Sequence, residues 1–267
     1  MNLFARCALI CMLLPAAAAV QAQGFSALIS PPRVETAVKP GQTTRQVLEV
    51  TQVGAQPGRF RVYTSDWSLD AAGSVTFSQE VKEASCRPWV ALERREMTVP
   101  GNGKTRFRFE ITPPADTPAK ECRFAIMFEG LDTSTVSPGA GGVSFPVSGR
   151  IGVIVYAGMA GTQAQLQIMG QTVSNDASKL PTLQVRNTGT AHGRLAGLLT
   201  GTDAKGTKLE FTPTTLPVLP GETRDINLNA NLEGGAAVTQ INYPVTVKGA
   251  IEMGDKRLAF EQTFKAP

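Results

Sequence analysis

The sequence lacks the motifs on which common enzyme and cofactor sites depend. It has no Gly-x-Ser-x-Gly segment, which excludes the nucleophile elbow of the α/β-hydrolases. No glycine-rich phosphate loop precedes a helix, and no zinc-binding spacing of cysteine and histidine occurs. Helix signals are almost absent beyond the N-terminal segment. We therefore expect a protein that is not an enzyme and that needs no cofactor.

Histidine occurs once, as His192, in the turn-like segment Thr188–Gly193. A catalytic histidine needs a positioned partner, and the neighbouring residues suggest none. We therefore expect His192 to be a surface turn residue. Three isolated carboxylates, at Asp66, Asp70 and Asp132, lie near turns, where aspartate commonly stabilises the backbone. A glycosidase-type pair is defined in space rather than in sequence, so that alternative stays open.

Long hydrophobic runs are also missing, except at the N-terminus. Residues 2–6 are weakly basic, Cys7–Val20 are almost entirely apolar, and Val20-Gln21-Ala22 resembles a small-x-Ala cleavage site. This pattern predicts a cleaved secretory signal peptide over residues 1–22. The alternative is an uncleaved anchor, for which the run is short. No other window approaches that length, so we expect an exported protein with no stable membrane insertion.

Cysteine is scarce. Cleavage of the signal would remove Cys7 and Cys11 and leave Cys86 and Cys122. In an oxidising compartment such a pair favours one disulfide, which would stabilise the fold by about 3–4 kcal/mol. The alternative is two buried free thiols. Together with His192 the pair offers too few ligands for a metal site.

Charge of one sign does not dominate, since the formal net charge is +4. The basic residues are scattered, and Arg59/Arg61 and Arg106/Arg108 sit two residues apart, on one face of a strand each. That spacing is typical of a solvated sheet face, so we expect no nucleic-acid partner.

What the sequence does have is alternating apolar segments punctuated by Gly, Pro and Thr. These predict an all-β fold of two tandem immunoglobulin-like sandwiches. A weak internal echo supports two copies: the turn Asp70–Gly73 corresponds to Asp203–Gly206, and Pro100-Gly101 corresponds to Pro220-Gly221. We expect a first domain over residues 23–156, a linker over 157–161 and a second domain over 162–267. The strands expected are 28–34, 45–53, 59–67, 75–79, 89–92, 105–111, 122–129, 143–156, 240–251 and 256–264.

The strand expected at 143–156 stands out. Val143, Phe145 and Val147 alternate with small or polar residues, behind a Gly/Ser/Pro-rich loop at 134–142. Such alternation usually marks a core strand. Behind a flexible loop, it also suits an edge strand that pairs with another chain, whose alternate side chains then select the partner.

Three segments together resemble the periplasmic pilus-assembly chaperones, the PapD-like family. Leu28–Val34 is similar to that family's first strand, Val143-x-Phe145-x-Val147 to its donor strand, and Ile151–Tyr156 to the strand that closes its first domain. The resemblance implies two domains in an L shape, a periplasmic location and donor-strand complementation. In that process the chaperone lends a strand to a pilin-like subunit and delivers it to an outer-membrane usher.

The resemblance also implies an anchor for the terminal carboxylate of the subunit, made by an arginine and a lysine in the interdomain cleft. Arg33 matches the arginine, whereas Gly152 stands at the place of the lysine. Arg150 lies two residues earlier on the same strand face, and we expect it to substitute. Pro146 removes one N–H from the expected donor strand.

Two other functions remain open. One is a non-chaperone cell-envelope interaction module, such as an immunoglobulin-like adhesive domain, and pilin and usher genes beside this gene would argue against it. The other is a hydrolase on a β-sandwich, for which a deep cleft with paired carboxylates would argue.

Overall fold

The computed structural model describes residues 26–132, 135–138, 144–147 and 149–266, with the side chains of 135–138 and 144–147 left aside. The expected signal peptide and Val143 lie outside the described residues. Within these residues, no helix has the length and apolar character needed to cross a membrane.

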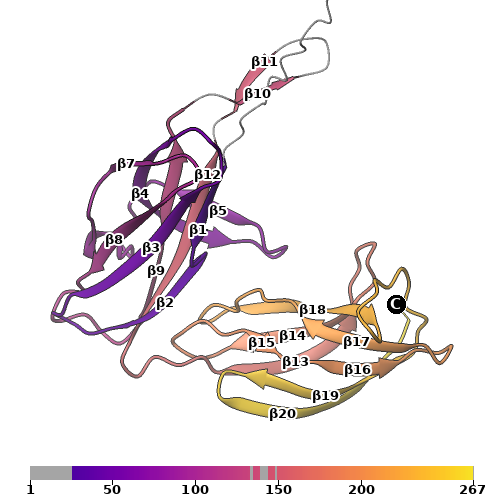
Figure 1. The fold of residues 1–267 in the computed structure, drawn as a ribbon. Helices are drawn as coiled ribbons and strands as arrows, with labels where there is room; N and C mark the ends of the chain where they lie inside the picture. Colours follow the sequence, from indigo (N-terminus) through magenta and orange to yellow (C-terminus); the bar gives the residue numbers. More distant parts are fainter. Residues whose placement is uncertain (1–25, 133–134, 139–143, 148, 267) are drawn as a thin grey trace, which may run out of the picture.

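The first sandwich consists of two sheets (Figure 1). One has the order β1 (Ala27–Ser30), β3 (Thr44–Gln52), β8 (Lys104–Ile111) and β6 (Val90–Leu92). The other has the order β2 (Arg33–Val38), β12 (Arg150–Met159), β9 (Glu121–Gly130), β4 (Gly58–Leu69) and β5 (Val75–Ser78), and β7 (Glu96–Val99) also pairs with β4. Only the β2–β12 pairing is parallel; the others described in this sandwich are antiparallel.

The core of the first sandwich follows from the alternation of its strands. Phe107 and Phe109 of β8 point inward and meet Phe128 and Phe124 of β9 edge to face, with ring centroids 5.3 and 6.4 Å apart. All four rings are buried. Full burial of one such side chain stabilises the fold by about 1.5–3 kcal/mol, and edge-to-face packing adds to this.

The second sandwich is an eight-stranded sheet that folds over on itself. Its order is β13 (Leu166–Val173), β14 (Pro181–Asn187), β18 (Thr223–Leu232), β17 (Lys208–Pro213), β16 (Leu199–Thr202), β19 (Val245–Met253) and β15 (Leu195–Ala196), with β20 (Lys256–Phe264) also on β19. The first half of β18 pairs with β14 and the second half with β17. Strand β18 thus joins the two layers, and β13 lies against β20. Phe211, Ile226 and Leu228 are buried between the layers.

The predicted all-β fold with two immunoglobulin-like sandwiches is confirmed, because the two hydrophobic cores share no residue. The disulfide is confirmed as well. Cys86 precedes the short 3₁₀ helix η1 (Arg87–Trp89) and is bonded to Cys122 of β9, with their Cα atoms 6.0 Å apart. Strand β12 runs on to Met159, so the first residues of the expected linker are strand, and 160–165 lie between β12 and β13.

Two expected strands are divided. The segment 28–34 forms β1 and β2, which belong to different sheets. Pro31 and Pro32 lie between them, and their missing N–H groups interrupt the ladder. The segment 143–156 forms β11 (Ser144–Val147) and the first part of β12. Strand β11 pairs with β10 (Thr135–Pro138), and Figure 1 shows this hairpin projecting from the end of the first sandwich.

Candidate functional site at the junction of the two sandwiches

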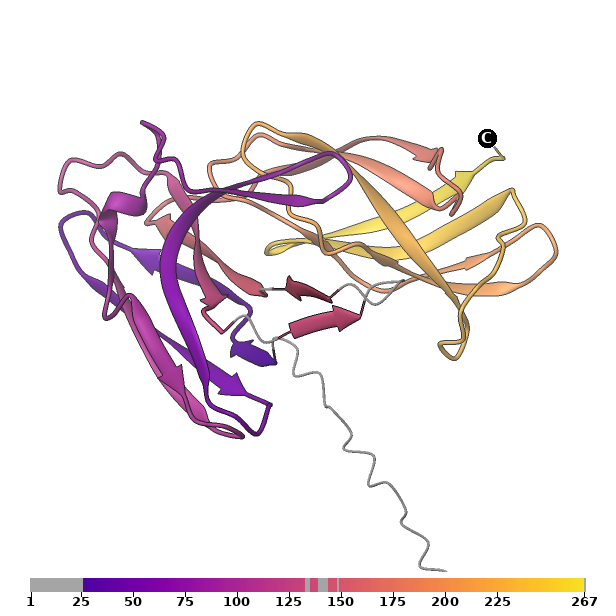
Figure 2. The same cartoon turned by 90° about the horizontal axis from the view of Figure 1, so that it is seen from above.

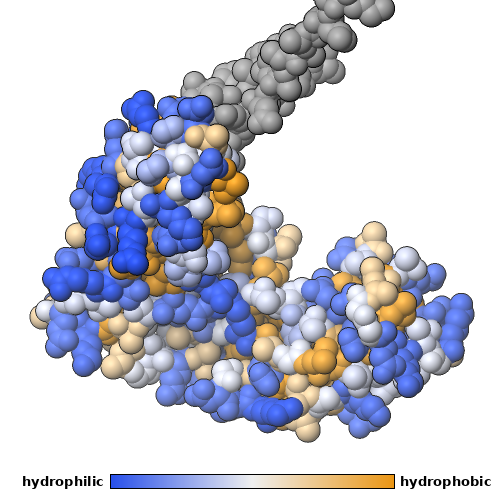
Figure 3. Space-filling view, viewed as in Figure 1, coloured by the Kyte–Doolittle hydropathy of each residue, from blue (hydrophilic) through white to orange (hydrophobic). Residues whose placement is uncertain are grey.

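The two sandwiches meet at a cluster of ionisable side chains, which we call the ionic junction: Glu35, Glu121, Tyr156, His192 and Arg194. The first three lie on β2, β9 and β12 of the first sandwich, and the last two lie between β14 and β15 of the second. Figure 3 shows a hollow between the sandwiches, with apolar surface on the side of the first sandwich that borders it.

Strand register brings the first-sandwich residues together. Val153 and Val155 of β12 point into the core, so Ile154 and Tyr156 face away from it. Tyr156 is paired in register with Glu35 on one side and with Arg123 on the other. The ring of Trp67, on β4, meets Tyr156 edge to face at 5.7 Å. The outer face of this sheet thus carries a row of polar and aromatic groups.

His192 is not the surface turn residue that the sequence suggested. Its side chain is only 8% exposed, and its Nδ1 lies 2.6 Å from Oε2 of Glu121, itself 4% exposed. The backbone N–H of His192 donates to Oε1 of the same carboxylate, at 3.1 Å. The partner is 71 positions away in the chain, which is why no neighbouring residue pointed to it.

The hydrogen bonds of His192 define its tautomer. Nε2 lies 2.6 Å from Nη1 of Arg194, which can only donate. Nε2 is therefore the acceptor, and Nδ1 carries the proton that goes to Glu121. The imidazole stacks on Tyr156, with ring centroids 3.6 Å apart. Burial raises the pKa of Tyr156, and the charge of Arg194 opposes that rise.

Glu35 connects the junction to Arg33. Its Oε1 accepts from Nη1 of Arg194 at 2.9 Å, forms an ion pair with Arg33, whose Nε is 2.7 Å away, and lies 3.4 Å from Nε2 of His192. Partial burial would raise the pKa of Glu35, but His192, Arg194 and Arg33 outweigh it and hold this pKa below its ordinary value. The carboxylate of Glu35 thus links Arg33 of the first sandwich to His192 and Arg194 of the second.

A second contact joins the sandwiches, which we call the hairpin contact: residues 70–73 of the β4–β5 turn, with Leu216 and Arg224. Figures 1 and 2 show this turn extending toward the second sandwich. Arg224, 4% exposed, donates from Nη1 to the carbonyl of Asp70 at 2.6 Å, and it pairs with Glu222. Leu216 packs so closely on Gly73 that a Cβ there would lie 2.8 Å from Cδ2 of the leucine.

Of the expected anchor residues, only Arg33 lies at the junction. Its register partner on β12 is Ile154, whereas Arg150 is four residues away, or about 13 Å along the strand. A Cβ at position 152 would lie 2.7 Å from Cζ of Phe77, so a longer side chain requires that ring to move. Arg150 and Arg33 are on one face of the sheet, but the structure does not bring them together.

Of the expected donor-strand residues, Phe145 and Val147 lie in a described strand, and Val143 lies outside the described residues. Phe145 and Val147 lie in β11, where they are paired in register with Ser137 and Thr135 of β10. Among the described strands β11 has no partner on its other edge. A main-chain edge in the hairpin is thus available for pairing, as far as the described residues go.

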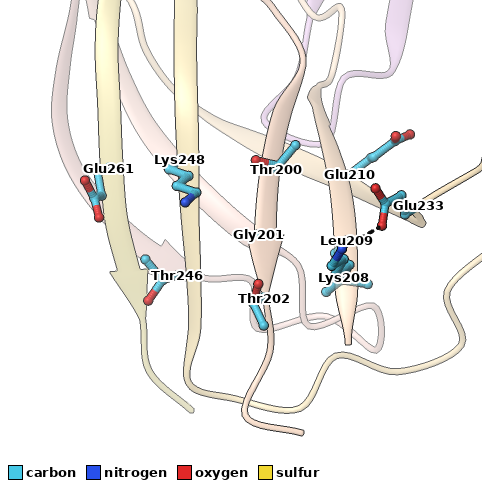
Figure 4. Close-up of a pocket in the computed structure, with 10 residues that line it drawn as sticks. All are labelled: Thr200, Gly201, Thr202, Lys208, Leu209, Glu210, Glu233, Thr246, Lys248 and Glu261. Atoms are coloured by element: carbon cyan, nitrogen blue, oxygen red, sulfur yellow. Dashed lines mark ion pairs between the residues drawn. The ribbon is translucent and has the colours of Figure 1, made fainter. Parts of the chain in front are cut away.

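Other hollows offer less chemistry. Figure 4 shows a pocket on the outer face of the second sandwich, where Lys248 of β19 lies between Thr200 and Glu261 in register. Such alternation of charge is typical of a solvated sheet. A second hollow, of ≈ 520 Å³, is lined by Trp67 and Arg123 and by the disulfide-bonded Cys86 and Cys122. No group of three or more metal-ligating side chains occurs in the part of the chain that the structure describes.

Comparison with known proteins gives no family. No family model matches the chain, and no curated protein matches it. Solved structures with a similar arrangement include the YadV chaperone, 10% identical with a TM-score of 0.48, over 89% of this chain and 99% of that one. The Pseudomonas aeruginosa CupB2 chaperone is 12% identical with a TM-score of 0.48, over 89% and 100%.

A third is the CsuC–CsuE chaperone–tip adhesion subunit complex of Acinetobacter baumannii, 15% identical with a TM-score of 0.45, over 90% and 100%. Likeness at this level does not assign the chain to a family or give it a function.

Proposed function

We propose that this protein is a periplasmic chaperone that captures pilin-like subunits by lending them strand β11 and delivers them to an outer-membrane usher. The observation that carries the proposal is the projecting β10–β11 hairpin, in which β11 has one edge without a partner among the described strands. Such an edge pairs readily with an incomplete sheet. Phe145 and Val147, with Val143 before them, would supply the side chains that enter the subunit.

Arg33 supports the second half of the proposal, the binding of the subunit's terminal carboxylate. Its side chain is 47% exposed and forms an ion pair with Glu35 of the ionic junction. An arginine binds a carboxylate through two parallel charge-assisted hydrogen bonds. The sequence also suggested Arg150, and its distance from Arg33 makes it the weaker candidate for the same carboxylate.

The proposal is tested by capture of a purified pilin-like subunit. Phe145→Asp should abolish capture, because a charge cannot enter an apolar groove unpaired. The matched control is Val47→Asp. Val47 is an exposed residue of β3, away from the hairpin, and should tolerate the same change. Arg33→Ala should weaken capture about tenfold, and Arg150→Ala should not.

Circular dichroism of each variant is the folding control. Equal capture by Phe145→Asp and Val47→Asp would contradict donor-strand lending. A protein that captures no such subunit, but binds a host or envelope surface, would be an adhesive module instead.

A further inference from the structure

We infer that Glu35 and Arg194 are positioning residues for Arg33, so that the second sandwich takes part in carboxylate binding by the first. The inference rests on the proposed function, because it concerns the same arginine and the same ligand, the free C-terminal carboxylate of a polypeptide. It adds that neither Arg150 nor position 152 completes the site.

The geometry leaves the outer end of Arg33 available. Nε of Arg33 forms an ion pair with Glu35 at 2.7 Å, and no hydrogen bond joins its guanidinium to another described residue. The ion pair places Nε on the side of Glu35 and restrains the turning of the guanidinium about its last bonds. Its Nη1 and Nη2 therefore point together, as a bidentate hydrogen bond to one carboxylate requires.

Glu35 is itself held from the second sandwich. Arg194 donates to it at 2.9 Å, and this arginine is fixed by the carbonyl of Thr215 at 3.1 Å and by the hydroxyl of Tyr156 at 3.3 Å. The side chain of Arg194 is 17% exposed, whereas that of Glu35 is 47% exposed. Arg33 is thus connected, through the carboxylate of Glu35, to the buried pair of His192 and Glu121.

The charges around this connection suit a single anion. Three arginines, Arg33, Arg123 and Arg194, face two glutamates, Glu35 and Glu121, around Tyr156. The three arginines exceed the two glutamates by one positive charge, which one carboxylate would balance. The alternative role for Glu35 is to compete with the ligand's carboxylate for Arg33. Positioning and competition predict opposite effects on ligand binding when the charge of Glu35 is removed.

The experiment uses the full chain and two small probes, N-acetyl-glycyl-glycine with a free carboxylate and the same molecule as an amide. Binding is followed in every variant by NMR at the backbone amides of β2, and also at the Nε–H of Arg33 where that residue is kept. The acid should bind and the amide should not. Glu35→Asp keeps the charge but withdraws the acceptor, and should weaken acid binding about tenfold. Arg194→Lys keeps the charge but loses the fork, and should act similarly.

Glu35→Gln keeps the shape without the charge, and should change acid binding less than Glu35→Asp does. Tighter binding by Glu35→Gln would overturn the inference in favour of an internal competitor. Wild-type affinity in both Glu35→Asp and Arg194→Lys would also overturn it. If Arg33→Ala still prefers the acid over the amide, the carboxylate anchor of the proposed function itself is wrong. If only Arg33→Ala loses the preference for the acid, and the Glu35 and Arg194 variants keep wild-type affinity, the carboxylate anchor stands and the positioning roles are refuted.

Discussion

The two contacts between the sandwiches are built from different chemistry. The ionic junction joins titratable side chains, with Glu121 and His192 almost fully buried. The hairpin contact joins Arg224 to neutral backbone carbonyls and Leu216 to a glycine. Arg224 makes its hydrogen bonds across the contact to neutral carbonyls and pairs with Glu222 within its own sandwich, whereas the bonds across the ionic junction go to carboxylates. The hairpin contact therefore serves to hold the sandwiches, and only the ionic junction reaches Arg33.

The disulfide supports one contact more than the other, and its loss should have the largest effect. Cys122 adjoins Glu121, so the bond fixes the strand end that carries the carboxylate. Replacing Cys86 and Cys122 by serine should lower stability by about 3–4 kcal/mol. Both tryptophans, Trp67 and Trp89, lie in the first sandwich, so fluorescence during urea unfolding reports on that sandwich. An unchanged midpoint would contradict this prediction.

Breaking the ionic junction should have the next largest effect. His192→Phe keeps a ring against Tyr156 but removes the Nδ1–H, which leaves the buried Glu121 with one donor fewer. We expect a loss of about 2–3 kcal/mol in the free energy of unfolding, measured by the same fluorescence. His192→Gln retains a donor and should recover part of this loss. Equal stability of His192→Phe and wild type would show that the junction contributes nothing.

Breaking the hairpin contact should cost somewhat less. Arg224→Met keeps the stem and removes the hydrogen bonds to the turn, so we expect a loss of about 2 kcal/mol in urea unfolding. The matched control is Arg186→Met on the neighbouring strand β14, where the arginine is exposed and the change should stay within about 0.5 kcal/mol. If the two variants lose the same stability, the hairpin contact is not what holds Arg224.

Acid should have the smallest effect on stability, and this effect should come from Glu35 of the ionic junction. The pKa of Glu35 is lowered in the folded protein below its ordinary value of 4.5, so its stabilising contribution is complete above that pH. It is lost as the pH falls through the lowered pKa. The acid limb of a melting-temperature profile should therefore be shallower in Glu35→Gln than in wild type, and unaltered in Arg186→Met, which removes an exposed arginine outside both contacts. An unaltered limb in Glu35→Gln would remove Glu35 from the account.

Local pattern was enough to predict several strands of the first sandwich. Alternation predicted strands at 45–53, 105–111 and 122–129, and these are β3, β8 and β9 within one residue at each end. The disulfide followed from the count of cysteines left after the expected signal peptide. These features depend on residues close in sequence, or on a choice with few alternatives.

The junction was not predictable in the same way. His192 and Glu121 come from different sandwiches, and no periodicity in either segment signals their pairing. The division of 143–156 into β11 and β12 depends on the pairing of β11 with β10, which alternation alone does not specify. A lone histidine followed two residues later by an arginine was the only hint, and it gains meaning only once the partner strand is known.

The most direct test of the chaperone proposal is a photocrosslink from the expected donor strand. A benzophenone amino acid at position 145, with the same amino acid at position 47 as the control, would be irradiated in the presence of a purified pilin-like subunit. We expect a crosslink from position 145 to the subunit and none from position 47. Crosslinking from neither position, or from 47 alone, would contradict the lending of β11.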